Sequence, residues 1–296
     1  MRVVIAGSSG LIGTTLVALL RQAGHDVLRL VRRPARAPDE RRWDPPAATM
    51  DADTFDGVDA VVNLCGSAMG NRRWSGEVKQ AIRDSRIIPT EVLAAAVAEY
   101  RVPMLVNASG VNYYGDTGHR EVDETAPSGS GFLAEVCRDW EAATVPAEQA
   151  GARVVRLRTG PVISPSGGLM GQLKPLFALG LGGRLGSGQQ YMPWISLDDE
   201  VGAIRFALEH DEVCGPVNLT GPNPVTNAEF TQAVGEVMHR PTLLVVPGFA
   251  LRLVRGGELV DEMVLAGPRA VPVVLRKHGY PFQHRTVTAA LAAALE

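Results

Sequence analysis

The chain of 296 residues is long enough for one large domain or two interleaved lobes, and its 46% hydrophobic and 21% charged residues are typical of a soluble globular protein. The formal net charge of -3 argues against nucleic acid or an anionic membrane as the main partner, and no apolar stretch approaches the roughly 20 residues of a membrane span. The three cysteines are scattered without metal-ligand spacing, so we expect a cytoplasmic protein with no metal site.

The chain begins with a strand, a glycine-rich turn and a helix. An apolar run over residues 3–6 is followed by glycines at every third position and then by apolar residues at helical spacing. In such a turn the glycines permit a sharp bend, close approach of a pyrophosphate and close packing of helix on strand, while the helix N-terminus faces the phosphates. The predicted nucleotide contacts are Gly7, Ser9, Gly10, Leu11, Ile12 and Gly13. The alternative is a glycine-rich turn that binds nothing.

The end of the second predicted strand indicates which dinucleotide would bind. This strand covers 26–31 and is followed by Arg32 and Arg33. Enzymes that prefer NAD usually place a carboxylate here for the ribose 2′-hydroxyl, whereas arginine suits the 2′-phosphate of NADP. We therefore predict NADP(H) as the cofactor, with Arg32 as the main contact and Arg33 or a later loop arginine assisting. The alternative is a solvated basic loop, because further arginines lie close by in the sequence.

Strand-like and helix-like segments alternate through the rest of the first half. We predict strands over 59–66, 104–110 and 153–160, and helices over 75–100, divided at Pro89, and over 132–144. This alternation predicts an α/β fold, a doubly wound parallel sheet of the Rossmann type. Ligands of such sheets lie beyond the carboxyl ends of the strands, so we expect Cys65, Gly66 and Ser109 to border the ribose and nicotinamide.

The second half of the chain differs in composition from the first. A stretch rich in glycine over 164–190 predicts a mobile loop on the substrate side, and the segment 194–208 leads into a helix. Thr226 and Glu229 form a predicted capping box at the start of another helix, and an alanine-rich helix closes the chain. We expect a nucleotide-binding domain over 1–160, with sheet elements returning from about 190–240, and a substrate-side and C-terminal region over 161–296.

Several motifs together resemble a known protein family. They are the GxxGxxG turn, "DAVVNLCG", "RW...VK..IRDSRI..T" over residues 73–90, "NASGVNYYG", "FLAEVCRDWE", "GLGGRLGSGQQYMPWISLDD", "GPVNLTGPNPVTNAEF" and "GPRAVPVVLRKHGYPF". They are similar to the extended short-chain dehydrogenase/reductases, and most of all to an atypical branch of epimerase-family proteins resembling nucleoside-diphosphate-sugar epimerases. The resemblance covers nearly the whole chain. It implies an extended Rossmann fold, a nicotinamide cofactor and a homodimer formed through two long helices.

The resemblance also implies a catalytic pair that this sequence does not contain. Typical members use a tyrosine as acid and base, and a lysine four residues later that lowers the pKa of the tyrosine and holds the nicotinamide ribose. No tyrosine in this chain is followed by lysine at that spacing. The alignment puts Leu133 at the place of the tyrosine, Cys137 at that of the lysine and Gly110 at that of the usual serine. Ser109 stands one residue earlier.

Other groups are therefore candidates for the proton transfer. We select Ser109, Tyr113 and Lys79 as tentative catalytic residues. For Tyr113 a packing role is about as plausible as a catalytic one. For Lys79 the alternative is a solvated helix residue, although a lysine can shift its pKa in a desolvated site. Two function classes follow: an NADP(H)-dependent oxidoreductase or epimerase-like enzyme acting on a small molecule, or a non-catalytic NADP(H)-binding regulator or redox sensor, linked to cell division in some relatives.

The substrate side departs from that of sugar-nucleotide enzymes. Met192 and Pro193 precede "WISLDD" where relatives usually have arginine and aspartate. Arg158 and Arg184 are the remaining candidates for anion contacts, with a solvated or salt-bridged arginine as the alternative. Asp198 and Asp199 are expected to cap the following helix rather than to catalyse.

Overall fold

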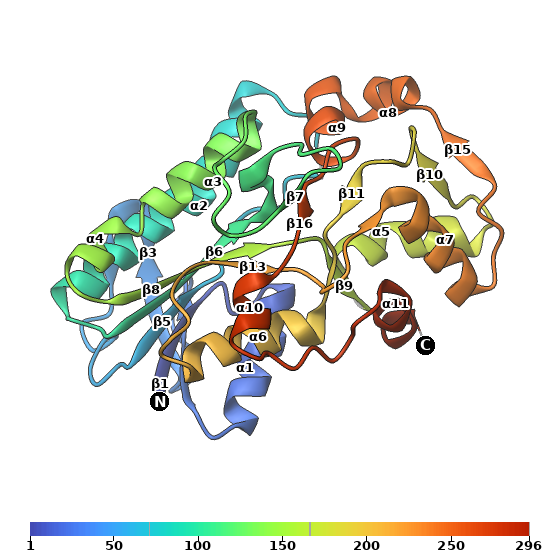
Figure 1. The fold of residues 1–296 in the computed structure, drawn as a ribbon. Coiled ribbons are helices and arrows are strands. Elements are labelled where there is room, and N and C mark those ends of the chain that lie inside the picture. Colours follow the sequence, from blue (N-terminus) through green and yellow to red (C-terminus); the bar gives the residue numbers. More distant parts are fainter. Residues whose placement is uncertain (71, 166, 296) are drawn as a thin grey trace.

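The computed structural model describes residues 1–70, 72–165 and 167–295 and contains one eight-stranded sheet with helices on both faces (Figure 1). The strand order is β13-β8-β6-β5-β1-β2-β3-β4, and all neighbours are parallel except the antiparallel pair β3 and β4. The strands are β1 (Arg2–Ala6), β2 (Asp26–Val31), β3 (Glu40–Asp44), β4 (Thr49–Met50), β5 (Ala60–Asn63), β6 (Met104–Gly110), β8 (Arg153–Thr159) and β13 (Gly215–Leu219).

Alternating side chains of the buried strands build one core on each face of the sheet. Val3 and Ile5 of β1 pack toward α1 (Leu11–Gln22) and α6 (Leu197–Glu209). Val4 packs into the opposite core with α2 (Gly76–Glu99). The helices α3 (Phe132–Ala142) and α4 (Val145–Gln149) extend the layer of α2. This is the Rossmann-type α/β architecture that the alternation of segments predicts.

Two sequence expectations about this half need correction. The predicted strand over 59–66 ends at Asn63, so Cys65 and Gly66 lie in the loop beyond it. The predicted division at Pro89 is wrong, because α2 continues through the proline without a break. Proline removes one helical N–H, but Pro89 is buried and the apolar face of α2 packs on the sheet around it, which keeps the helix continuous.

The second half has a smaller core of its own, formed mainly by α5 (Gly168–Ala178), α7 (Asn227–Met238) and α11 (Val287–Leu295). The expectation of a loop over 164–190 is wrong for α5, because Met170 and Phe177 are buried there against this core and their packing outweighs the glycine content. The capping box of Thr226 and Glu229 and the closing alanine-rich helix are confirmed.

Short elements complete the chain. They are η1 (Pro45–Ala47), η2 (Val111–Tyr114), β7 (Glu121–Val122), β9 (Val162–Ser164), β10 (Gly183–Leu185), β11 (Tyr191–Met192), β12 (Ile195–Ser196), β14 (Val225–Thr226), β15 (Leu244–Val246), α8 (Gly248–Arg255), α9 (Gly257–Met263), β16 (Arg269–Ala270) and α10 (Val273–Lys277). Through β16, which pairs with β7, and through Leu275 and Tyr280, the C-terminal segment returns to the first half of the chain. None of the helices in the described residues combines the length and apolar character that a membrane span requires.

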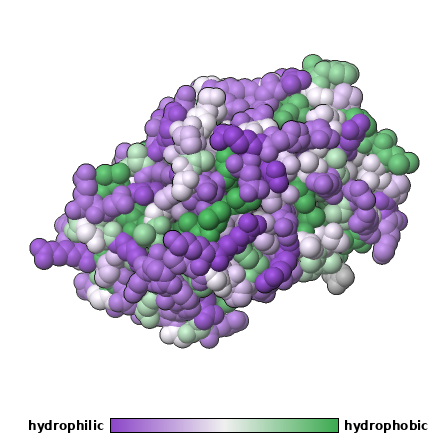
Figure 2. All heavy atoms as spheres, viewed as in Figure 1, coloured by the Kyte–Doolittle hydropathy of each residue, from purple (hydrophilic) through white to green (hydrophobic). Residues whose placement is uncertain are grey.

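The surface is mainly hydrophilic in Figure 2, with hydrophobic residues gathered at the upper right, over α8 and β15. Large apolar side chains are exposed there, at Leu243, Phe249, Leu253 and Val254.

Candidate nucleotide-binding site

The glycine-rich turn between β1 and α1 has no room for side chains at its first and third glycines. Gly7 has φ +80°, and a Cβ on it would lie 2.7 Å from the backbone of Leu64. A Cβ on Gly13 would lie 2.3 Å from the carbonyl oxygen of Gly7. The N–H of Gly10 donates to that same carbonyl at 3.1 Å and closes the turn. The glycines are therefore required by close backbone packing, as in a turn that cradles a pyrophosphate.

The N-terminus of α1 is open to an anion. Its N-cap is Gly10, no side chain caps the helix and no acidic residue lies in its first turn. Ser9 and Gly10 are exposed, and Leu11 and Ile12 are half-buried. Free N–H groups and the helix dipole at such an end favour a phosphate, and the uncapped end fits the phosphates of a dinucleotide.

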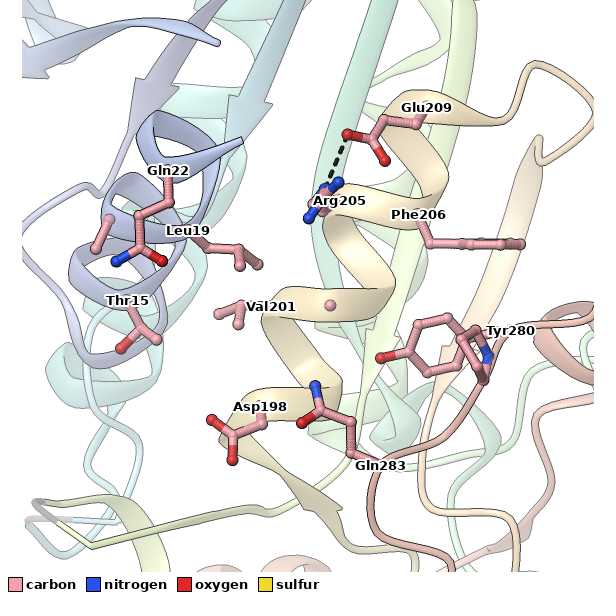
Figure 3. A pocket seen from close by; sticks show the side chains of 13 residues that line it. Thr15, Leu19, Gln22, Asp198, Val201, Arg205, Phe206, Glu209, Tyr280 and Gln283 are labelled. Carbon is pink, nitrogen blue, oxygen red and sulfur yellow. Dashed lines mark hydrogen bonds and ion pairs between the residues drawn. The ribbon is translucent and has the colours of Figure 1, made fainter. Parts of the chain in front are cut away.

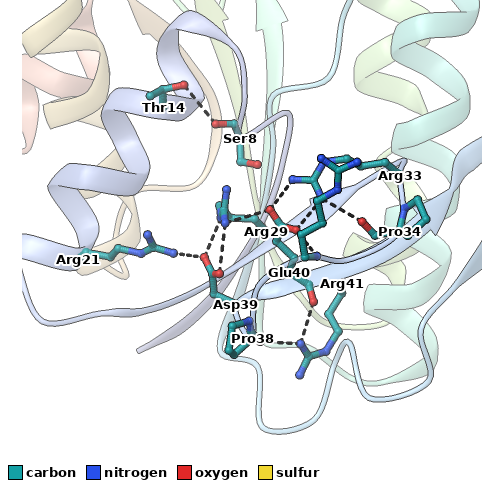
Figure 4. Close-up of polar contacts among 11 residues, drawn as sticks. Ser8, Thr14, Arg21, Arg29, Arg33, Pro34, Pro38, Asp39, Glu40 and Arg41 are labelled. Atoms are coloured by element: carbon teal, nitrogen blue, oxygen red, sulfur yellow. Dashed lines mark hydrogen bonds and ion pairs between the residues drawn. The ribbon is translucent and has the colours of Figure 1, made fainter.

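Several arginines around the end of β2 are held by hydrogen bonds and ion pairs, which Figure 4 shows. Arg33 forms two hydrogen bonds of 2.7 Å with the carboxylate of Glu40, and Arg29 binds Asp39. These hydrogen bonds lower the pKa of Asp39 and of Glu40 to about 2. Arg32 is exposed, and the described residues offer it no hydrogen bond or ion pair.

Arg32 and Cys65 lie within electrostatic reach of one another. Burial raises the pKa of the Cys65 thiol to about 12, and the charge of Arg32 acts in the opposite direction. The thiol therefore stays protonated near neutral pH and is no nucleophile. The N–H of Cys65 donates to the side chain of Asn63, which in turn donates to Asn107 and Thr90. This buried network fixes the carboxyl ends of β5 and β6, where the predicted site lies.

Ser109 and Tyr113 meet at a buried ion pair. The hydroxyl of Ser109 donates to Glu141 at 2.8 Å, and both carboxylate oxygens of Glu141 accept from Arg158. The guanidinium carbon of Arg158 lies 3.5 Å from the ring centroid of the half-buried Tyr113. Arg158 also donates to the hydroxyl of Tyr114. Arg158 is therefore a salt-bridged arginine, which is the alternative to its predicted role as an anion contact. Arg184 is an exposed residue whose guanidinium donates to a carbonyl within its own turn.

Lys79 lies elsewhere, at the contact of α2 with α9. Its ammonium is 2.5 Å from the carboxylate of Glu258 and 4.6 Å from the ring centroid of Phe132. A second carboxylate of α9, Glu262, accepts the N–H groups of Phe132 and Leu133. Thus α9 covers the N-terminus of α3, and Lys79 is near Leu133 but makes no contact with Ser109 or Tyr113.

The positions that correspond to the family's serine and lysine lie together. A Cβ on Gly110 would be 3.6 Å from the sulfur of Cys137. Cys137 is buried, which raises the pKa of its thiol to about 12. Leu133 is also buried, in a cluster with Ile82, Phe132 and Val136. Leu133 thus lies among apolar side chains, whereas the charges of Glu141, Arg86 and Arg158 act on the thiol of Cys137. Neither Leu133 nor the protonated thiol of Cys137 can exchange a proton near neutral pH.

The expected role of Asp198 and Asp199 needs correction. The N-cap of α6 is Ser196, whose hydroxyl accepts the N–H of Asp199 at 3.1 Å. The buried carboxylate of Asp199 instead accepts the backbone N–H groups of Gln283 and His284. It therefore fastens the C-terminal segment onto α6.

A groove of about 460 Å³ lies between α1 and α6 (Figure 3). Polar side chains line part of it, including Gln22, Asp198, Arg205 and Gln283. None of the predicted site residues lines it, and it is a separate surface feature. No group of His, Cys, Asp and Glu in the described ranges is arranged to hold a metal ion.

Sequence reasoning missed Arg86 and Glu141. Arg86 is buried on α2 and bonded to the carbonyl oxygen of Ser67, and Glu141 is buried on α3. A usable signal existed for Arg86, since it stands four residues after Ile82 and four before Thr90, on the buried stripe of α2. A charged residue on the apolar face of a helix is a candidate for function.

The parallel sheet with its strand order and glycine-rich turn defines a Rossmann-fold protein of the short-chain dehydrogenase/reductase type. The chain belongs to the NAD dependent epimerase/dehydratase family, whose model matches residues 3–219. A second model, a domain of unknown function called DUF1731, matches residues 246–294. Both matches confirm the family resemblance carried by the sequence motifs.

Relatives extend over the whole chain. "Epimerase family protein Mb2239" of Mycobacterium bovis is 56% identical over 292 residues, which are 99% of this chain and 97% of that protein. The crystal structure of human epimerase family protein SDR39U1 (isoform 2) with NADPH has a TM-score of 0.92 at 34% identity and 99% coverage of both chains. UDP-glucose 4-epimerase of Thermus thermophilus in complex with NAD, at 20% identity with a TM-score of 0.75 over 99% of this chain and 98% of that one, shares the fold.

Proposed function

We propose that this protein binds NADP(H) and transfers hydride between the nicotinamide and a small-molecule substrate. One observation carries the choice of nucleotide. Of the two arginines directly after β2, Arg33 is neutralised by Glu40, whereas Arg32 is exposed and forms no ion pair with the described residues. A 2′-phosphate would supply the missing partner. The NADPH in the structure of human SDR39U1 supports the same choice.

Titration of the purified protein with NADPH and NADH tests this part. We expect NADPH to bind at least about tenfold more tightly, and Arg32→Ala to remove that preference, because a charge-assisted hydrogen bond to phosphate is lost. Arg42→Ala, which changes an exposed arginine on β3, serves as the control. Equal affinity for the two nucleotides in the unchanged protein would contradict the proposal.

The chemistry of the hydride transfer needs a proton carrier from this chain. Bound NADPH supplies the hydride, while Leu133 and Cys137 stand where typical relatives have tyrosine and lysine. We propose either Tyr113 or Lys79 as the group that exchanges the proton, because both keep partly accessible side chains and they lie in different places. Ser109 is buried against Glu141, and we propose that it positions the end of β6 beneath the nicotinamide.

A screen for NADPH oxidation across carbonyl compounds and sugar nucleotides tests the reaction. With a substrate found, Lys79→Met and Tyr113→Phe are compared with the unchanged protein. We expect the variant of the true proton carrier to lose about 10²–10⁴-fold in kcat. Turnover that survives both changes would show that neither residue is the proton carrier.

A non-catalytic NADP(H)-binding sensor is the second candidate. The residues at positions 110, 133 and 137 favour it, because none of these three residues can carry a proton near neutral pH. The sensor predicts tight NADPH binding without turnover of any compound, together with different hydrogen-exchange protection of α9 in the presence of NADPH and NADP⁺. A homodimer through α2 and α3 and a cytoplasmic location stay predictions, which light scattering and cell fractionation test.

A further inference from the structure

One buried cation has no balancing charge among the residues that the structure describes. Arg86 is 6% exposed, and its guanidinium donates only to neutral acceptors. These are the carbonyl oxygens of Ile82 and Ser67, at 3.0 and 2.9 Å, and the hydroxyl of Ser85 at 3.1 Å. The ion pairs formed by the described residues do not include Arg86. Its three hydrogen bonds leave two of the five guanidinium N–H donors for another acceptor.

The guanidinium lies against the loop that follows β5. A Cβ on Gly66 would be 3.4 Å from its central carbon and from one of its terminal nitrogens, so the guanidinium touches this loop directly. Ser85 reinforces the contact, because its hydroxyl accepts the N–H of Ser67. This loop lies beyond the carboxyl ends of β5 and β6, where a doubly wound sheet binds its ligand.

On its other side Arg86 faces α3. Its guanidinium carbon is 5.3 Å from the ring centroid of Trp140. Its charge acts on the thiol of Cys137, the residue at the place of the family's lysine. Arg86 of α2 thus brings a positive charge to the region from which α3 lacks one.

An unbalanced buried charge lowers stability unless something supplies its counterpart. Transfer of an ion out of water is unfavourable by several kcal/mol even after relaxation. Neutral acceptors take three of the five guanidinium N–H groups of Arg86 but do not balance its charge. A ligand with phosphate and hydroxyl oxygens would do both.

We infer that Arg86 binds the nicotinamide mononucleotide half of NADP(H), through its ribose hydroxyls and adjacent phosphate, and thereby supplies from α2 the cation that relatives carry on α3. This inference rests on the proposed function. Arginine remains charged at every working pH, so Arg86 is a nucleotide-binding residue and no proton carrier.

The position of the charge has an electrostatic consequence. The nicotinamide ring is neutral in NADPH and positively charged in NADP⁺. A buried cation beside this half of the nucleotide repels the oxidised ring, so the site favours NADPH over NADP⁺. A residue that merely held the loop would not discriminate between the two forms.

Calorimetric titration of the full-length protein with NADPH, NADP⁺ and 2′,5′-ADP tests the inference. 2′,5′-ADP contains the adenosine half and the 2′-phosphate but lacks the nicotinamide half. We expect Arg86→Met to weaken the affinity for NADPH about 10- to 100-fold and to change the affinity for 2′,5′-ADP by no more than about twofold. The ratio of the affinities for NADPH and NADP⁺ should also become smaller. Arg86→Lys keeps the charge, so it should weaken NADPH but retain that preference, and it replaces Arg86→Met if the latter fails to fold.

Arg83→Met is the matched control, because Arg83 lies on the same helix and pairs with Asp139 at the surface. It should bind all three ligands as the unchanged protein does. Equal weakening of NADPH and 2′,5′-ADP by Arg86→Met, or no weakening of either, would overturn the inference and leave Arg86 as a support for the loop. Failure of the unchanged protein to bind NADPH would overturn the proposed function itself, which is a distinguishable result.

Discussion

Two buried arginines in this protein have opposite electrostatic surroundings. Arg158 is 3% exposed and forms a two-pronged ion pair with Glu141, whereas Arg86 is 6% exposed and bonds only to neutral groups. Burial alone therefore does not tell a structural charge from a functional one. The charges around the residue make this distinction. Glu141 neutralises Arg158 within the fold, whereas the counter-charge of Arg86 comes from a ligand.

The largest effect on stability is expected at the ion pair of Arg158 and Glu141. Glu141→Gln leaves the guanidinium of Arg158 buried without a counter-charge, and we expect a loss of about 3–5 kcal/mol in the free energy of unfolding. Urea denaturation of the protein without ligand measures it. A loss below about 1 kcal/mol would mean that the pair is not the structural element that its geometry indicates.

A buried carboxyl group provides a third case, because it can avoid an unbalanced buried charge by keeping its proton. Glu200 is fully buried, accepts one hydrogen bond from Thr159 and has a second oxygen without a partner in the described structure. Burial raises the pKa of Glu200 to about 8 from its ordinary 4.5. The folded state then holds a proton that the unfolded state releases between these two values, so this group's contribution to stability falls as pH rises from about 4.5 to about 8.

Glu200→Gln removes that pH dependence. We expect the variant to gain about 1–3 kcal/mol in unfolding free energy relative to the unchanged protein at pH 8 and little at pH 5. Thermal unfolding of both proteins across this range measures the difference. A difference that is constant with pH would show that Glu200 does not titrate in this interval.

For the unbalanced arginine the expected change in stability is small. Arg86→Met removes three hydrogen bonds but also a charge that no described residue balances, so we expect the unfolding free energy of the ligand-free protein to change by no more than about 1 kcal/mol. Urea denaturation without nucleotide measures it. A loss as large as that of Glu141→Gln would place Arg86 with Arg158 among the structural charges.

The smallest effect is expected at an exposed pair. Arg205 and Glu209 are four residues apart on α6 and pair at the surface. Arg205→Met should change the unfolding free energy by about 0.5 kcal/mol or less. This variant sets the baseline for the three buried substitutions in the same denaturation series.

Local patterns in the sequence were sufficient to predict the Rossmann half and its glycine turn. The strand β1, the bend at Gly7 and the helix after it depend on near neighbours, so spacing alone reveals them. The unpaired state of Arg32 was not predictable, because it depends on Glu40 and Asp39 pairing with other arginines.

Features set by distant contacts were missed for the same reason. Helix α5 exists because it packs on α7 and α11, which outweighs its glycine-rich neighbourhood. The burial of Arg86 results from the packing of α2 against the loop after β5 and against α3. Glu262 accepts the N–H of Phe132 at the N-terminus of α3, a contact between residues about 130 positions apart that no local pattern encodes.

The attachment of the last segment of the chain to the first half also bears on how the protein is synthesised. Asp199 binds the backbone at Gln283 and His284, and Leu275 and Tyr280 fill the core shared by β1 and α1. The N-terminal half therefore cannot finish packing before residues 275–284 have left the ribosome. Contacts that span so much of the sequence slow folding, and a nascent chain would expose apolar surface until these residues have emerged.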